Sequence, residues 1–123
     1  MFELKVGDKV VNLKWGTYAM KLLCDRTGTT LDGFFALLGK MADSPTQQEA
    51  FNMLQWFLHA GYEYANGVKA TDQEVCEWID DLGGIVAVNQ GQMVDYINYV
   101  VSSTMNGVTP LPGDRLTDSK KKE

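Results

Sequence analysis

Few residues in this chain of 123 are of the types that perform catalysis or hold metal ions. His59 is the single histidine, and Gln55 and Glu63 stand four residues to either side of it. It has no second histidine in an H-x-x-x-H or H-E-x-x-H spacing, and a zinc site needs several histidine, cysteine or carboxylate ligands. We therefore expect a hydrogen-bonded structural histidine, with no metal site and no catalytic centre, and a contact with Glu63 on the polar stripe is the alternative.

The two cysteines, Cys24 and Cys76, are 52 residues apart and form no metal-binding or redox motif. Isolated cysteines of this kind are usually reduced thiols in the core of an intracellular protein. We expect reduced core thiols here, and a disulfide or a catalytic thiol is the alternative.

Other catalytic and cofactor motifs are missing as well. The chain has no glycine-rich phosphate loop and no G-x-S-x-G nucleophile motif. Asp43 and Ser44, at a predicted helix start, are similar to the serine region that carries the prosthetic group in acyl carrier proteins. Pro45 replaces the leucine of that family, and Ser44 is also explained as a helix cap. The sequence thus predicts no cofactor.

Acidic residues are concentrated in one short segment, residues 72–81. It holds Asp72, Glu74, Glu77, Asp80 and Asp81 without a basic residue among them. On a helix Glu74, Glu77 and Asp81 share one face, and the segment lacks the alternating spacing of a calcium-binding loop. Two interpretations remain open: a face that meets only water, or one that docks a basic partner. The candidate partner-binding residues are Glu74, Glu77, Asp80 and Asp81.

Composition limits the class of protein. The length predicts a single domain, and 45% hydrophobic with 22% charged residues is typical of a globular chain. The net charge of −5 argues against nucleic acid as the main partner, because phosphate binding needs a basic face. No apolar run approaches 18 residues, so we expect no membrane span. The N-terminus has no charged-then-apolar leader, so we expect no secretion signal.

Residues 44–65 predict the central helix around which the other elements pack. Ser44 is the expected cap, Pro45 fits the first helical position, and Gln47 completes a capping box. Apolar residues then cover most of the helix surface, which indicates neighbours on most sides. The remaining polar residues form one narrow stripe that we expect to meet water or a partner: Asn52, Gln55, His59 and Glu63.

The preceding segments predict a hairpin and two helices. Residues 2–6 alternate apolar and polar side chains, and the apolar-rich residues 10–13 follow a turn at residues 7–9, so the two segments predict a β-hairpin. A helix over residues 15–27 ends at Gly28. Thr29 and Asp32 open a second helix that ends near Gly39, and we expect its Phe34–Phe35 pair to lie in the core.

The following segments predict two more helices and a tail. Thr71 and Glu74 form a capping box, and Gly83–Gly84 ends that helix. Its apolar face consists of Val75, Trp78, Ile79 and Leu82. The last helix covers residues 89–105, and residues 106–123 read as a disordered tail. The expected fold class is α+β, mainly α: an N-terminal β-hairpin and about five packed helices in one domain, 1–105, with a flexible tail, 106–123.

Three stretches resemble the tail assembly chaperones of long-tailed bacteriophages. They are the hairpin running into LKWGTYAMKLLCDRTGTTLDGFFALL, the helix LQWFLHAGYEYA, and the segment ATDQEVCEWIDDLG. The resemblance implies a non-enzymatic protein of the host cytoplasm that binds the tape-measure protein and helps to recruit tail-tube subunits. It also implies self-association and absence from the mature virion.

Many members of that family are made in two lengths by ribosomal frameshifting. The lysine run 120–122 can be encoded by an adenine-rich slippery stretch, so this chain fits the short product. Three alternatives stay open: a structural tail or virion protein, an acidic helical adaptor that binds a host protein, and an enzyme or carrier that uses His59, Cys76 or Ser44. For a chaperone we expect apolar grooves between helices. The helical methionines Met20, Met41, Met53 and Met93 either adapt to partners there or fill the core.

Overall fold

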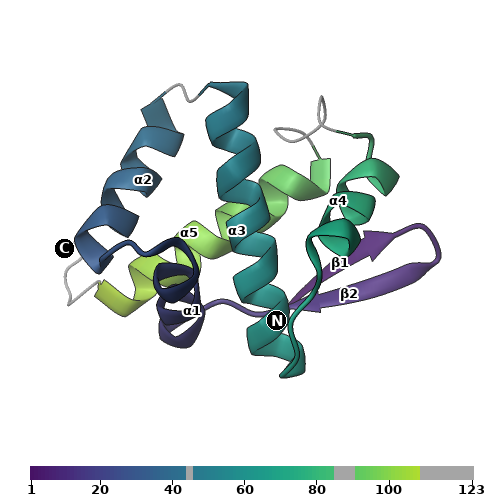
Figure 1. The fold of residues 1–123 in the computed structure, drawn as a ribbon, viewed down its shortest axis with the longest axis horizontal. Coiled ribbons are helices and arrows are strands. Elements are labelled where there is room, and N and C mark those ends of the chain that lie inside the picture. Colours follow the sequence, from purple (N-terminus) through teal and green to yellow (C-terminus); the bar gives the residue numbers. More distant parts are fainter. Residues whose placement is uncertain (44–45, 85–90, 109–123) are drawn as a thin grey trace, which may run out of the picture.

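The computed structural model describes residues 1–43, 46–84 and 91–108 (Figure 1). In these residues an antiparallel hairpin precedes five helices, which confirms the predicted fold class. The elements in chain order are β1 (Phe2–Val6), β2 (Lys9–Leu13), α1 (Thr17–Thr27), α2 (Leu31–Asp43), α3 (Gln47–Asn66), α4 (Asp72–Asp81) and α5 (Gly91–Val108).

The hairpin forms as its alternating pattern predicts. Val6 pairs with Lys9, so a two-residue turn connects the strands, one residue shorter than expected. Gly7 has a φ of 63°, which glycine adopts without the steric penalty of a side chain. One face of the two strands is apolar and buried against α3 and α5. Its buried residues are Leu4, Val6, Val11 and Leu13.

Helix α3 occupies the centre of the molecule, as the sequence predicts. In Figure 1, α1 and α2 lie on one side of it, α4 and the hairpin lie on the other, and α5 crosses behind it. Phe57 and Leu58 are fully buried. The phenol of Tyr96 on α5 donates a 2.6 Å hydrogen bond to the carbonyl of Phe57, and burial raises the pKa of Tyr96 well above 10. The phenol therefore stays protonated and joins α5 to α3.

Two predicted helix starts are displaced in the structure. The cap of α3 is Thr46, whose hydroxyl accepts from the Glu49 N–H while the Glu49 carboxylate accepts from the Thr46 N–H. Ser44 and Pro45 lie outside the described residues. Glutamate is a better capping-box partner than the predicted glutamine, Gln47, because its charge strengthens the hydrogen bond and complements the helix dipole. At the start of α2, Thr30 rather than Thr29 accepts from the Gly33 N–H, 3.1 Å away.

The predicted helix ends are partly correct. As predicted, Gly28 adopts a left-handed conformation at the end of α1 and Thr71 caps α4 through its box with Glu74. Gly67 adopts the same conformation after α3, which ends at Asn66, one residue beyond its predicted end. Helix α2 does not end near Gly39 but continues to Asp43. The reason is that glycine inside a helix carries only a modest penalty, which the packing of Phe34, Leu37 and Leu38 on the core offsets.

Helix α5 begins at Gly91 and ends at Val108. Asn89, its predicted first residue, lies outside the described residues. The helical backbone continues past residue 106, where the tail was predicted to begin, and residues 109–123 are not described. Met93 and Val100 face the core. Near the end of the helix the buried Trp15 indole donates to the Thr104 hydroxyl, 2.9 Å away, which joins α5 to the segment before α1.

Candidate functional site

His59 lies in a polar cluster that connects three helices. Its side chain is 5% exposed, and its Nε2 atom lies 2.9 Å from Oδ1 of Asp72, the first residue of α4. Arg26, from α1, donates to the same Asp72 oxygen over 2.9 Å, and its Nη2 lies 3.3 Å from His59 Nε2. The described partners of His59 are therefore Arg26 and Asp72, and the alternative contact with Glu63 is not among them. These two partners come from α1 and α4, so packing between helices decides the contacts of His59 rather than i, i+4 spacing within α3.

Burial lowers the pKa of His59, and the nearby Arg26 charge lowers it further. The carboxylate of Asp72 opposes this effect without reversing it. The imidazole is therefore neutral near pH 7 and serves as a hydrogen-bonding group between helices. This position matches the structural histidine that the sequence predicts.

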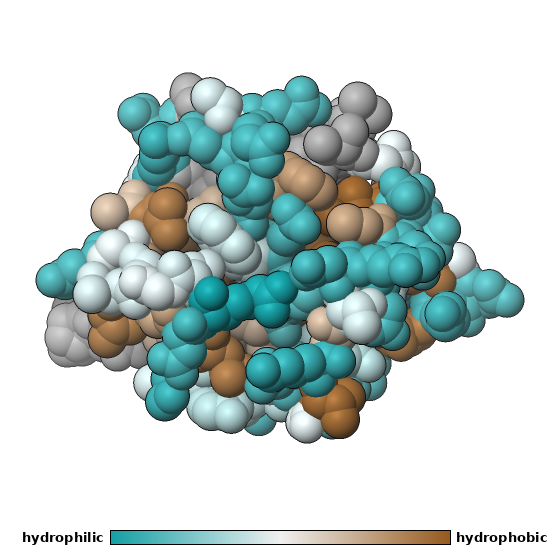
Figure 2. Space-filling model, in the orientation of Figure 1, coloured by the Kyte–Doolittle hydropathy of each residue, from teal (hydrophilic) through white to brown (hydrophobic). Residues whose placement is uncertain are grey.

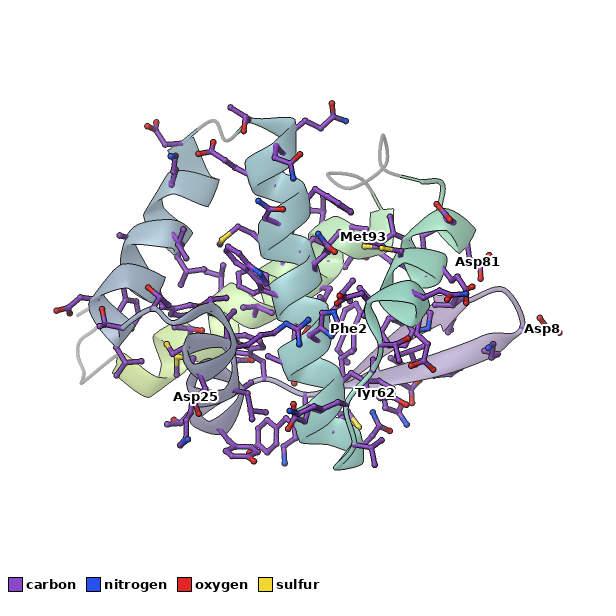
Figure 3. All side chains as sticks on the ribbon, in the orientation of Figure 1. Phe2, Asp8, Asp25, Tyr62, Asp81 and Met93 are labelled. Carbon is purple, nitrogen blue, oxygen red and sulfur yellow. The ribbon has the colours of Figure 1, made fainter. Side chains whose placement is uncertain are left out.

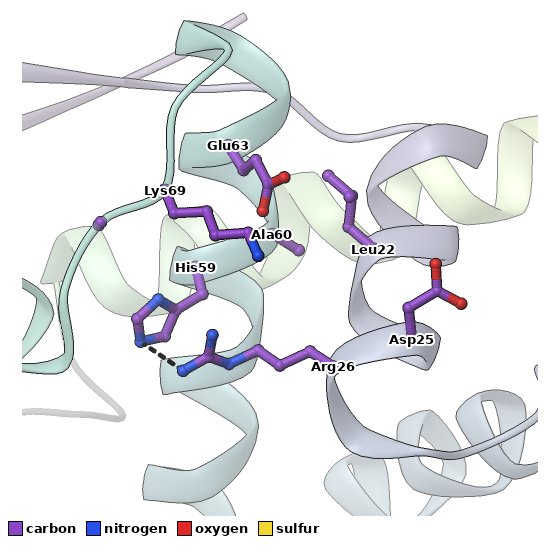
Figure 4. Close-up of a pocket in the computed structure, with 8 residues that line it drawn as sticks. Leu22, Asp25, Arg26, His59, Ala60, Glu63 and Lys69 are labelled. Carbon is purple, nitrogen blue, oxygen red and sulfur yellow. Dashed lines mark hydrogen bonds between the residues drawn. The ribbon is translucent and has the colours of Figure 1, made fainter.

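A cavity of about 260 Å³ opens beside His59, between α1, α3 and the segment that leads into α4 (Figure 4). Arg26 and Lys69 contribute positive charges to its wall, and Asp25 and Glu63 contribute negative ones. The side chains of Lys69 and Glu63 both extend over the cavity in Figure 4. Because the opposite charges balance, the cavity does not favour an anion or a cation. It is also smaller than most ligand pockets, so we assign it no ligand.

The structure does not bring the candidate nucleophiles to His59. Cys24 and Cys76 are free thiols, each half-buried rather than in the core as predicted, and neither lines the cavity beside His59. Burial and the neighbouring Asp25 raise the pKa of Cys24, so its reactive thiolate is depleted. Ser44 lies outside the described residues. Among the described residues, no group of three or more histidine, cysteine or acidic side chains is placed to hold a metal ion.

The acidic residues of α4 form an exposed face, as the sequence predicts. Glu74 and Glu77 also form hydrogen bonds within the helix. The Glu74 carboxylate accepts from the Thr71 N–H, and the Glu77 carboxylate accepts from the Gln73 side-chain amide. The side chains of Asp80 and Asp81 form no hydrogen bond or ion pair among the described contacts, and Asp81 points away from the body of the molecule in Figure 3. Carboxylates at a helix C-terminus are unfavourable because the dipole is negative there. Their presence fits a role outside helix stability.

Helix α2 has a second apolar face that the sequence analysis missed. Phe34 is fully buried as predicted, but Phe35 is 38% exposed and Leu31 is 55% exposed, so the prediction that both phenylalanines are core is half wrong. Leu38 is half-buried on the same side. We call Leu31, Phe35 and Leu38 the α2 stripe. Figure 2 shows apolar surface among polar residues over this helix. The i, i+4, i+7 spacing was the available signal.

A shallow groove continues the α2 stripe toward α1. Leu31 lines it together with Lys21 and Cys24, and its volume is about 300 Å³. Met20, Met53 and Met93 do not contribute to such a surface, because all three are buried and fill the core. The side chain of Met41 lies outside the described residues. Apolar contact with a partner is instead available from leucine and phenylalanine.

The free edges of the hairpin are partly occupied by side-chain amides. Gln92 accepts from the Lys5 N–H over 2.8 Å and donates to the Lys5 carbonyl over 2.9 Å, so its amide takes the place of a neighbouring strand. On β2 the Asn66 amide donates to the Asn12 carbonyl, 3.0 Å away. These contacts reduce the backbone available for pairing with another strand.

Comparison with known proteins gives no relative from which a function is transferred. No protein-family model, no curated protein and no solved structure matches the chain. In the described ranges, every helix is too short or too polar to cross a membrane.

Proposed function

We propose that this chain is a non-enzymatic tail assembly chaperone of a long-tailed bacteriophage. In this role it binds the tape-measure protein in the host cytoplasm, helps to recruit tail-tube subunits, and is absent from the mature virion. The resemblance of three sequence stretches supports the family. The observation that carries the binding role is the α2 stripe, because Leu31 and Phe35 are exposed on a helix that reaches the core through the buried Phe34.

The α2 stripe suits the apolar face of a partner helix. A long helical protein that is not yet assembled exposes such faces, and a chaperone must cover them to prevent aggregation. Helix-in-groove binding uses apolar anchors spaced i, i+4 and i+7, which is the spacing of Leu31, Phe35 and Leu38. The acidic face of α4 supports recruitment of a partner with basic flanks, since opposite charges raise association rates.

Co-expression with a candidate tape-measure protein tests this function. We expect the wild-type chain to keep that protein soluble and to co-elute with it in size-exclusion chromatography. Leu31→Ser is expected to lose co-elution. Val68→Ser is the matched control, because Val68 is 58% exposed, close to the 55% of Leu31, but lies after α3. A tape-measure protein that precipitates with or without this chain would refute the proposal. Light scattering of the chain alone tests the predicted self-association.

Frameshifting is part of the same proposal and has a genetic test. The short product is expected to come from a gene with an A-rich heptamer at the lysine codons 120–122 and an overlapping downstream frame. A gene that lacks the heptamer, or lacks the overlapping frame, would refute frameshifting and leave the proposed chaperone role unaffected.

An acidic adaptor that binds a host protein is the second candidate function. The exposed acids at the C-terminal end of α4 favour it, since they carry charge where the helix dipole disfavours it. Reversing Asp80 and Asp81 to lysine separates the two functions. An adaptor loses its partner entirely, whereas a chaperone that binds through the α2 stripe loses mainly association rate. A third candidate, a structural tail protein, predicts that the chain is present in purified virions.

A further inference from the structure

Helix α4 is fastened to the rest of the molecule by one polar side chain. Its backbone hydrogen bonds stay within the helix and its ends: Thr71 and Glu74 form the box at its start, and the Gly84 N–H donates to the Ile79 carbonyl. In the part of the chain that the structure describes, only Asp72 forms a hydrogen bond or ion pair from α4 to another element. Helix α5 differs, because hydrogen bonds join its side chains to β1, α3 and the segment before α1.

Asp72 connects the start of α4 to two other helices. Its Oδ1 atom accepts from Arg26 Nη2 over 2.9 Å and lies 2.9 Å from His59 Nε2. The Asp72–Arg26 pair is exposed, and exposed ion pairs contribute little to stability. His59 is buried, however, and a neutral imidazole with its proton on Nε2 donates to the same oxygen. Loss of Asp72 would leave that buried N–H without its partner, which is costly.

The face of α4 that packs on α3 is apolar. Val75, Trp78 and Ile79 are buried on it, and the Trp78 ring lies 5.2 Å from the Tyr62 ring of α3, measured between centroids. Helix α3 is the single described element whose backbone lies close to that of α4. Separation of α4 from α3 would therefore expose an apolar surface on each of the two helices.

Glycines lie at both connections of α4. Gly67 ends α3 with a φ of 75°, and Gly83 and Gly84 follow α4 with φ values of 118° and 83°. Glycine moves between left-handed and right-handed backbone conformations without the penalty of a Cβ atom, which suits it to a hinge. In Figure 1, α4 lies beside α3 on the side of the hairpin. A rotation at these glycines would move α4 away from α3 without breaking a backbone hydrogen bond to another element.

We propose that α4 is a hinged lid, latched by Asp72, that lifts away from α3 about Gly67 and Gly83–Gly84. The open state exposes apolar surface, so it is a minor state that a ligand stabilises only by covering that surface. The occupant that fits α3 in place of α4 is a partner helix with the pattern of α4: a carboxylate, then apolar residues three, six and seven positions later. Only this occupancy rests on the proposed function, to which it adds a second binding surface.

Thiol labelling of the full chain tests whether the lid opens by itself. Val75 on α4 and Val100 on α5 are both fully buried, so Val75→Cys and Val100→Cys place matched thiols, each combined with Cys24→Ser and Cys76→Ser. In native buffer we expect the first thiol to react about tenfold faster than the second, which is exposed only by global unfolding. Equal rates would overturn the lid. Ile79→Cys, at another buried position of the lid, repeats the measurement if Val75→Cys does not fold.

Asp72→Asn tests the latch in the same experiment. It preserves the shape of the side chain, removes its charge, and is expected to raise the labelling rate of Val75→Cys about fivefold while that of Val100→Cys stays unchanged. Glu74→Gln is the matched control. It removes an acid from the same turn, retains a capping box, and its described hydrogen bonds stay within α4 and its cap.

Two further results would overturn the latch. One is an unchanged labelling rate in Asp72→Asn, and the other is an equal increase in Glu74→Gln, which would assign the effect to the helix dipole. No tape-measure protein is present, so failure here leaves the proposed chaperone function standing. Failure of the co-expression experiment likewise leaves the lid standing.

Discussion

Helices α2 and α3 are both rich in apolar residues, yet the fold uses them differently. Helix α3 contacts every other helix and β2, so each of its apolar side chains is buried or half-buried and none is exposed. Helix α2 packs on α1 and α3 alone among the closely contacting elements and leaves Leu31 and Phe35 exposed. Apolar content therefore sets how much surface a helix needs to bury, and the number of neighbours sets how much it does bury. The remaining apolar surface on α2 is available for binding.

The largest difference between the two helices is expected from phenylalanine truncation. Phe57→Ala in α3 removes a fully buried ring that packs on Trp15 and Phe34, and is expected to destabilise the fold by about 3–5 kcal/mol. Phe35→Ala in α2 is expected to change stability by less than about 1 kcal/mol because its ring is partly in water. Urea denaturation measures both. Equal losses would show that the α2 stripe is part of the core.

A glycine on α3 is expected to give the next largest effect. A Cβ atom at Gly61 would clash with the Tyr96 hydroxyl oxygen, whose hydrogen bond to the Phe57 carbonyl fixes its position. Gly61→Ala is expected to destabilise the protein by about 1–3 kcal/mol through overpacking. Adding Tyr96→Phe removes the clashing oxygen, so the double variant is expected to recover part of the loss in thermal unfolding. No recovery would mean that the clash lies elsewhere.

The polar stripe of α3 is expected to make stability depend on pH. The pKa of His59 is lowered in the folded state below its ordinary 6.5, so the unfolded chain binds the proton more readily. The stability that the neutral His59 contributes is therefore fully present above pH 6.5 and decreases as the pH falls below that value. His59→Gln is expected to remove this part of the decline between about pH 7.5 and pH 5.5 in denaturant titrations. An unchanged decline would assign it to other groups.

The smallest effect is expected at a glycine on α2. A Cβ atom at Gly39 would meet no atom within 4 Å, and the residue lies inside a helix. Gly39→Ala is expected to stabilise the protein by about 0.5–1 kcal/mol, since alanine loses less backbone entropy. An increase in the urea midpoint checks this. A decrease would indicate that another surface approaches Gly39 in solution.

Local signals in the sequence were sufficient for the element order and most helix ends. The Thr71–Glu74 box, the left-handed Gly28 and Gly67, and the alternation in the hairpin each depend on residues a few positions apart, so they can be recognised without the fold. Two competing local signals were harder to separate. Ser44 with Gln47 and Thr46 with Glu49 both match a capping box, and the structure uses the second pair.

Contacts between distant residues could not be predicted in this way. The partners of His59 are 13 and 33 positions away, and its burial comes from α1 and α4 packing beside α3. Phe34 and Phe35 are adjacent and chemically identical, but only Phe34 faces Trp15 and the core. The sequence by itself determined which side chains are apolar and favour burial, because apolar character belongs to each residue. Only the tertiary structure decided which of them are buried, because burial depends on how the helices pack around each side chain.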